Sequence, residues 1–192
     1  KQALPDGGRV IIFVGKLDVQ NAIERRQGVM DELARKKDAK GPKLGKYELL
    51  DTLTDDASQE RCKANAEDAL GKHREDPESL CLVGLWAYNP PAMLAAVKGA
   101  DLAGRVSIIG FDENEETLQG IIDGHIKGTI VQQPFQFGYE AVRMLAGLEE
   151  VVLIQEPVAM AQFSHELFLL FLSTQFLPNR RQRLHQPRTT LR

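Results

Sequence analysis

The chain has 192 residues, of which 43% are hydrophobic and 27% are charged, a balance typical of a globular protein with one domain or two small ones. The formal net charge of −3 gives no reason to expect a nucleic-acid partner. The two cysteines show no Cys-x-x-Cys spacing and have no nearby histidine pair, so neither a metal site nor a cofactor is expected.

Apolar, β-branched runs mark the strands in chain order. The predicted strands cover residues 9–15, 47–53, 80–86, 106–111 and 126–131. The run at 106–111 contains almost no polar residue, which favours a strand buried on both faces. Residues 36–46, by contrast, are rich in lysine and glycine and are predicted to form a solvated connector.

Helical spacing of apolar residues predicts a helix after each strand. The predicted helices cover residues 19–34, 57–70, 90–99, 115–122 and about 137–147. Asp18 is a candidate cap for the first helix, and Gly71 and Gly124 are candidate stops for two others. Pro90 and Pro91 fit the first turn of the third helix. Strands that alternate with helices predict an α/β fold, a parallel sheet flanked by helices on both faces.

The predicted topology gathers polar residues at one edge of the sheet, because the carboxyl ends of parallel strands meet there. Carboxylate, amide and guanidinium groups at this rim exchange paired hydrogen bonds with hydroxyl groups, and aromatic faces cover the C–H side of a ring. This set suits a neutral polyol. The rim positions are residues 16–25, 54–56, 86–89, 112–114 and 132.

A further pattern runs from the fourth strand to the last helix. One strand ends in Gly-Phe-Asp, a helix ends in Gly, and the next strand ends in Gln-x-Pro before a Gly-Tyr pair. These residues, in this order, resemble the closing segment of type I periplasmic sugar-binding proteins, the ribose-binding-protein family, which shares its fold with the effector domain of lactose-repressor-like regulators. The matching residues are Gly110, Phe111, Asp112, Gly124, Gln132, Pro134, Gly138 and Tyr139.

The resemblance implies a domain organisation. Residues 1–129 correspond to the C-terminal-type α/β lobe of such a protein, and 130–150 to a crossover strand and a helix toward the other lobe. Residues 151–192 match nothing in the family and are predicted to be a divergent, partly disordered basic tail. The chain is therefore expected to be a fragment or an aberrant gene product of a solute-binding protein, with half a cleft and with weak or no sugar affinity of its own.

The resemblance also implies a function. The expected role is the solute-binding component of an ABC-type sugar importer, which captures a monosaccharide-like ligand in the periplasm and delivers it to an inner-membrane ABC permease. No enzymatic activity, nucleic-acid partner or membrane span is expected, and the polar start at residues 1–8 does not predict a signal peptide. The alternatives are the effector domain of a lactose-repressor-like regulator and a sugar-sensing ectodomain.

Asp112 and Gln132 are the first two candidate ligand contacts. Each directly follows a predicted strand and matches the family pattern. Asp112 has an alternative role as the N-cap of the next helix, with Glu115 three residues on, and Gln132 has an alternative role in satisfying loop backbone.

Arg25 lies in a Glu-Arg-x-x-Gly stretch that resembles the first helix of the family's lobe, where the arginine reaches a sugar hydroxyl. The alternative is a surface arginine paired with Glu24 or Asp31. The neighbouring Arg26 leaves the choice between the two arginines open.

The segment after the third strand departs from the family, which commonly has Asn-Asp where this chain has Asn89 followed by proline. Asn89 is expected to bond sugar hydroxyls, and Trp86 or Tyr88 either stacks on a ring or joins the core. Asp55 and Asp56 after the second strand are predicted to be a solvated helix start, with a position near the ligand site as the alternative.

The cysteines leave two alternatives open. Cys62 falls on a predicted helix and Cys81 on the following strand, so a disulfide is conceivable in an oxidising compartment. Two separately buried thiols are the favoured prediction.

Overall fold

The computed structural model describes residues 3–145, and the predictions for the basic tail lie outside them. The strands are β1 (Gly8–Val14), β2 (Lys43–Leu44), β3 (Tyr47–Thr54), β4 (Leu80–Gly84), β5 (Ser107–Phe111) and β6 (Gly128–Ile130). The helices are α1 (Gln20–Ala34), α2 (Gln59–Lys72), the 3-10 turn η1 (Pro77–Ser79), α3 (Asn89–Gly99), α4 (Glu115–Ile122) and α5 (Pro134–Leu145).

The strands form one sheet in the order β2-β3-β1-β4-β5-β6. β1 pairs in parallel with β3 and β4, and β5 pairs in parallel with β4 and β6, which confirms the predicted parallel sheet. The prediction of a plain connector at 36–46 was wrong, because β2 adds an antiparallel edge strand to β3. Leu44 anchors this two-residue strand by being fully buried.

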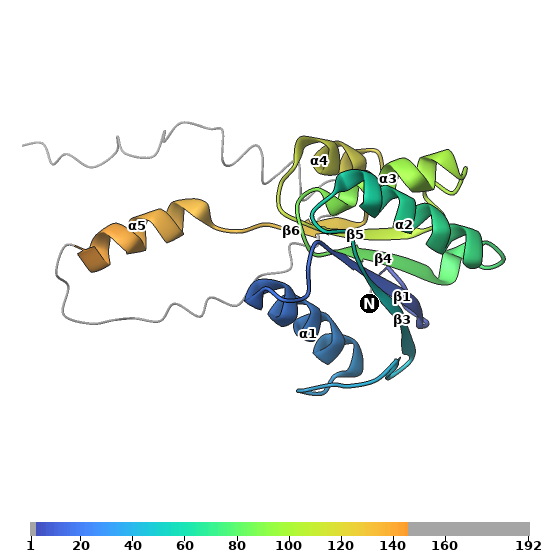
Figure 1. Ribbon diagram of the computed structural model, residues 1–192, viewed down its shortest axis with the longest axis horizontal. Coiled ribbons are helices and arrows are strands. Elements are labelled where there is room, and N and C mark those ends of the chain that lie inside the picture. Colours follow the sequence, from blue (N-terminus) through green and yellow to red (C-terminus); the bar gives the residue numbers. More distant parts are fainter. Residues whose placement is uncertain (1–2, 146–192) are drawn as a thin grey trace, which may run out of the picture. The chain divides into compact units, whose positions relative to one another are not determined.

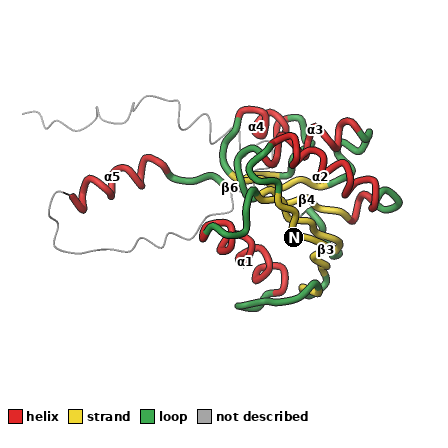
Figure 2. Tube along the Cα trace, viewed as in Figure 1, coloured by secondary structure: helices red, strands yellow, loops and turns green. Residues whose placement is uncertain are grey.

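Helices cover both faces of the sheet. Figure 1 shows α1 on one side and α2, α3 and α4 on the other, and Figure 2 shows the strands between them. On the α1 face, Met30 of α1 packs in one cluster with alternate strand residues such as Ile12 and Val83. On the opposite face, Phe13 and Ile108 pack with residues of the other helices. The alternation follows from the pleat, which sends successive side chains of a strand to opposite faces.

The helix ends agree only partly with the predictions. Asp18 does not cap α1, whose N-cap is Val19 without a side-chain hydrogen bond. Gly71 does not stop α2, which continues to Lys72. Gly124 follows the end of α4 with a φ of +76°, a left-handed value that suits glycine, so the predicted stop is confirmed.

The two cysteines lie in different cores. Cys62 of α2 is buried on the face covered by α2 and α3, and Cys81 of β4 is buried on the α1 face. Both are free, which confirms the prediction of separate thiols. Burial raises the pKa of each thiol to about 12. Between residues 3 and 145, none of the helices combines the length and the apolar character that a bilayer crossing requires.

Candidate functional site

The carboxyl ends of the parallel strands β1, β3, β4, β5 and β6 lie at one edge of the sheet. The polar segments that follow these ends are the rim predicted from the sequence. In open parallel sheets, this edge is where ligands bind. The predicted side chains differ sharply, however, in how far the structure leaves their polar groups available.

Asp112 and Gln132 form a hydrogen-bonded pair beyond β5 and β6. The amide Nε2 of Gln132 donates to Oδ1 of Asp112 at 2.5 Å. Asp112 is half-buried and Gln132 is exposed, so their remaining acceptor and donor positions face solvent. A carboxylate beside an amide presents both acceptors and donors to neighbouring hydroxyl groups.

The backbone of Asp112 holds a left-handed conformation, with a φ of +66°. Its N–H donates to the carbonyl of Ile130 at 2.7 Å, and its carbonyl accepts from Oγ1 of Thr129 at 2.8 Å. Two bonds to β6 thus fix a conformation that a non-glycine residue rarely adopts. The alternative role as N-cap of α4 is wrong, because that cap is Asn114, whose side chain accepts from the N–H of Glu116.

Arg25 of α1 joins the ends of two neighbouring strands. Its Nη1 donates to the carbonyl of Leu85 at 2.7 Å, and its guanidinium lies 4.7 Å from the ring centroid of Phe111. These two residues directly precede Trp86 and Asp112, so Arg25 brings both segments together. Because a guanidinium has five N–H donors, this placement leaves donors for a ligand.

The alternative in which Arg25 pairs with a surface acid is not what the structure has. Glu24 accepts from Gln20, and Asp31 accepts from Gln27 and from the N–H groups of Ala39 and Asp38. The hydrogen bond from Ala39 is the main reason that the pKa of Asp31 is lowered. The neighbouring Arg26 points instead to β3, where it donates to Oγ1 of Thr52.

Trp86 and Tyr88 lie edge to face, with ring centroids 6.2 Å apart and an interplanar angle of 76°. Trp86 packs against the core on the α1 face, whereas Tyr88 packs against the opposite core. The indole lies directly on Gly15, where an added Cβ would come within 1.9 Å of the ring. Both side chains are half-buried, so each contributes to the core and keeps some surface at the rim.

Asn89 has 0% exposure, and the structure uses both ends of its amide internally. Its Oδ1 accepts from the N–H of Trp86 at 2.8 Å, and its Nδ2 donates to Oδ2 of Asp55 at 3.2 Å. The same Nδ2 lies 3.4 Å from the sulfur of Cys62. The geometry therefore gives the predicted ligand contact Asn89 a role in holding its own loop.

Asp55 belongs to the predicted rim, but its buried role was not predicted from the sequence. The predicted solvated helix start is wrong for Asp55, which is 1% exposed, and right for Asp56, which is exposed and forms an ion pair with Arg61 at 2.5 Å. Strand alternation was the available signal, because Asp55 lies two residues after Leu53 and so shares its inward face.

Hydrogen bonds from several segments hold the Asp55 carboxylate. Oδ1 accepts from the hydroxyl of Tyr88 and, at 3.0 Å, from the N–H of Ala57, while Oδ2 accepts from Asn89. Burial raises the pKa of Asp55 despite these donors, of which Tyr88 counts most in the opposite direction. Burial and the bond to Asp55 also raise the pKa of the Tyr88 hydroxyl.

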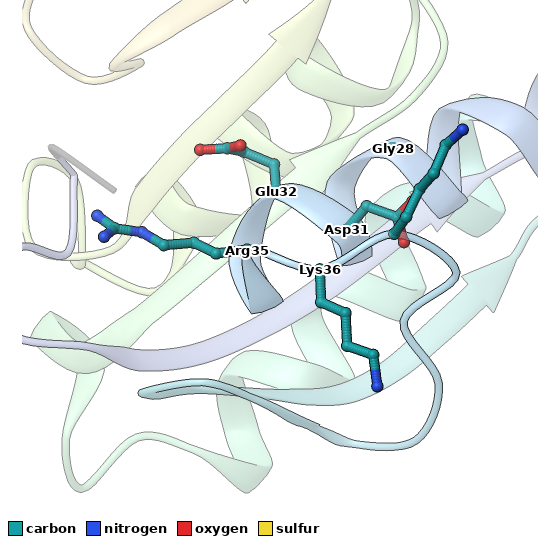
Figure 3. A pocket seen from close by; sticks show the side chains of 6 residues that line it. Gly28, Asp31, Glu32, Arg35 and Lys36 are labelled. Atoms are coloured by element: carbon teal, nitrogen blue, oxygen red, sulfur yellow. The ribbon is translucent and has the colours of Figure 1, made fainter.

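An open depression of about 700 Å³ lies elsewhere, at the C-terminal end of α1. It is lined by Gly28, Asp31, Glu32, Arg35, Lys36 and Lys37. In Figure 3 the labelled Arg35 and Lys36 extend away from each other instead of converging on one point. Among residues 3–145 no group of three or more histidine, cysteine or acidic side chains is arranged to hold a metal ion.

Comparisons with known structures agree with this architecture. The chain is 27% identical to a solute-binding protein of an ABC transporter from Burkholderia graminis in complex with D-arabinose, with a TM-score of 0.63 over 76% of this chain and 47% of that one. It is 26% identical to the XylFII molecule, with a TM-score of 0.62 over 75% of this chain and 49% of that one.

A third structure supports the fold alone. The solute-binding protein from Agrobacterium vitis with bound α-D-tagatopyranose is 20% identical, with a TM-score of 0.66 over 78% of this chain and 48% of that one. The chain thus spans about half the length of these structures. A comparison with curated proteins gives no match.

A family model described as a periplasmic binding protein domain matches residues 1–150. The match covers every strand and helix of the described structure, and two of the similar structures are ABC transporter solute-binding proteins with bound sugars. The α/β architecture, the rim and the family model agree, and the chain belongs to the periplasmic binding protein domain family.

Proposed function

We propose that this chain supplies one wall of a sugar-binding cleft in a solute-binding protein, and that the ligand is a monosaccharide held at the rim by Arg25, Asp112 and Gln132. The observation that carries the proposal is the Arg25 bridge, which joins the segment carrying Trp86 to the segment carrying Asp112. A guanidinium, a carboxylate–amide pair and an aromatic face thereby border the same edge of the sheet.

The chemistry of these groups fits a neutral sugar better than a charged ligand. Arg25 and Asp112 carry opposite charges, so a hydroxyl that donates to one and accepts from the other is matched at both ends. Trp86 and Tyr88 add apolar surface for the C–H face of a pyranose or furanose. Asn89 and Asp55 are buried and hold the segment with Trp86 and Tyr88 through hydrogen bonds, without contacting the sugar.

The proposed physiological role is sugar uptake outside the inner membrane, with an ABC permease as the partner that receives the ligand. A similar structure supports this role, since it is an ABC transporter solute-binding protein in complex with D-arabinose. Sugar would close the complete cleft by binding the closed state more tightly than the open one.

A sensing role is the second candidate. One similar structure, 27% identical to this chain, is a complex of XylFII with a partner named LytSN. A protein with this fold therefore assembles with a second protein. A sugar-responsive complex of that kind would use the same rim.

The test of the ligand site is a ¹H–¹⁵N NMR titration of the chain with D-arabinose, D-fucose and D-tagatose. Because one wall provides part of the contacts, we expect a Kd of about 1 mM or weaker, equivalent to roughly 4 kcal/mol. Shifts should concentrate at Asp112, Gln132, Arg25 and the Trp86 indole. Absence of shifts for every sugar would contradict the proposed site, and micromolar affinity would contradict the idea of a single wall.

The matched control replaces one of two aspartates with similar backbones. Asp112 and Asp101 both have left-handed φ values, +66° and +57°, and Asp101 is exposed before the amino end of β5. We expect Asp112→Asn to abolish the sugar-dependent shifts and Asp101→Asn to leave them unchanged. Asparagine tolerates the left-handed conformation, so neither replacement adds backbone strain.

A further inference from the structure

The buried carboxylate of Asp55 connects three separate segments of the chain. Asp55 follows β3, Cys62 belongs to α2, and Tyr88 and Asn89 are the N-cap and the first residue of α3. Both oxygens of the carboxylate accept hydrogen bonds. Two of the donors, Tyr88 and Asn89, belong to the rim segment 86–89, which also contains Trp86.

Capping of α2 does not explain this carboxylate. Ser58 is the N-cap of α2 and accepts from the N–H of Arg61 at 3.2 Å. A charged group without exposure is costly to desolvate and is retained where donors compensate it. The compensating side-chain donors here, Tyr88 and Asn89, lie more than 30 positions further along the chain, as the sequence separations of 33 and 34 show.

The network reaches the indole of Trp86 through the backbone. Asn89, held by Asp55, accepts from the N–H of Trp86, and Tyr88, also held by Asp55, packs edge to face with the indole. The indole Nε1 is itself buried without a hydrogen-bond partner among the described residues. The orientation of Trp86 therefore depends on its loop and on its packing, because no hydrogen bond of its own ring fixes it.

We propose that Asp55 is a positioning residue for Trp86 and Tyr88, the aromatic side chains of the proposed sugar site. It fixes their orientation through its hydrogen bonds with the Tyr88 hydroxyl and the Asn89 amide. The inference rests on the proposed function for its biological meaning. The positioning itself is measurable without any sugar. Trp86 is the only tryptophan in the chain, so its fluorescence reports this one position.

The experiment compares the emission maximum and acrylamide quenching of Trp86 in four proteins. These are the wild-type chain, Asp55→Asn, Tyr88→Phe and the control Asp56→Asn. Asp56 is adjacent in sequence but exposed and paired with Arg61. Far-UV circular dichroism and cooperative unfolding establish that each variant is folded. We expect a red shift and stronger quenching for Asp55→Asn and Tyr88→Phe, with no change for Asp56→Asn.

A pH profile separates positioning from general support of the fold. Burial raises the pKa of Asp55 above its usual 3.8. The emission of wild-type Trp86 should change as Asp55 takes up a proton, and this change should be lost in Asp55→Asn and kept in Asp56→Asn. The other titratable groups beside Asp55 are the Cys62 thiol of α2 and the Tyr88 hydroxyl. Burial raises the pKa of Cys62 to about 12 and raises the pKa of Tyr88 above its usual value, so neither group titrates at acidic pH. Asp56 and Arg61 are the exposed charges nearby, and the control variant accounts for Asp56.

Two outcomes would overturn the inference. Emission and quenching of Trp86 that stay at wild-type values in folded Asp55→Asn and Tyr88→Phe would reduce Asp55 to a structural residue. A pH profile that persists in Asp55→Asn would assign the titration to another group. Sugar titrations of the same variants are independent: failure of every form to bind would count against the proposed function, whereas the fluorescence would still decide the positioning.

Discussion

The two halves of the rim use the same residue types in opposite ways. At the ends of β3 and β4, Tyr88 and Asn89 both donate hydrogen bonds to Asp55, and the Asn89 amide also lies 3.4 Å from the sulfur of Cys62 in α2. At the ends of β5 and β6, Asp112 and Gln132 form one pair that remains open to solvent. An aspartate that directly follows a parallel strand is thus a support on one half and a candidate ligand contact on the other.

The largest expected effect tests the half of the rim at the ends of β3 and β4, here called the closed half because its polar groups bond internally. Asn89→Ala removes a hydrogen-bond donor to the buried Asp55 carboxylate and the acceptor for the backbone N–H of Trp86. We therefore expect a loss of about 2–4 kcal/mol in the free energy of unfolding. Urea denaturation measures this loss. A change below 1 kcal/mol, roughly that of a surface site, would break the distinction between the two halves.

The second prediction concerns the contact between Gly15 and Trp86 in the same half. Gly15→Ala places a methyl group where the indole lies, so the ring must move, and we expect a destabilisation of about 1–3 kcal/mol. Gly28→Ala is the control, because Gly28 lies within α1 with nothing near its added Cβ. That change should instead stabilise the chain by up to about 1 kcal/mol. Equal effects at both glycines would show that the indole does not rest on Gly15.

The third prediction gives the closed half a pH signature. Burial raises the folded-state pKa of Asp55 above its usual 3.8, so the folded state binds the proton more tightly than the unfolded state. The contribution of this carboxyl to stability is full below about pH 3.8 and is lost as pH rises through the folded pKa. The free energy of unfolding of wild type minus that of Asp55→Asn should therefore fall as pH rises through this window.

Denaturant unfolding at a series of pH values measures the difference. Asp56→Asn is the control for this slope, because Asp56 is adjacent to Asp55 in sequence but exposed and paired with Arg61. A difference for Asp55→Asn that grows with pH would have the wrong sign and would show that the donors outweigh burial.

The smallest expected effect on stability belongs to the open half of the rim, at the ends of β5 and β6. Gln132→Ala removes one bond between two solvent-accessible side chains, so the free energy of unfolding should stay within about 0.5 kcal/mol of wild type. The sugar-dependent NMR shifts should nevertheless weaken, because the amide is one of the proposed ligand contacts. A large loss of stability would mean that this pair also supports the fold.

The sequence predicted the sheet well because buried parallel strands are long apolar runs. β5 and β4 begin close to their predicted starts, but β4 ends at Gly84, before Leu85 and Trp86. β2 could not be predicted, since it has two residues, one of them lysine, and depends on pairing with β3. Its anchor Leu44 becomes visible only once the tertiary structure buries it.

The rim shows where local patterns stop being informative. Sequence position was enough to place Asp112 and Gln132 at the edge of the sheet, yet their mutual hydrogen bond depends on the neighbouring strands β5 and β6. Asp55 and Asp56 look equivalent as a charged pair. They differ because one follows the inward face of β3 and meets residues 33 and 34 positions later, a relation that no local pattern contains.

The placement of the two thiols has a practical consequence. Because Cys62 and Cys81 belong to cores on opposite faces of the sheet, the folded lobe cannot join them across its own strands. With pKa values of about 12, both stay protonated and unreactive at neutral pH. The described lobe should therefore reach the same covalent state in a reducing cytoplasm and in an oxidising compartment, and material produced without export serves for every experiment above.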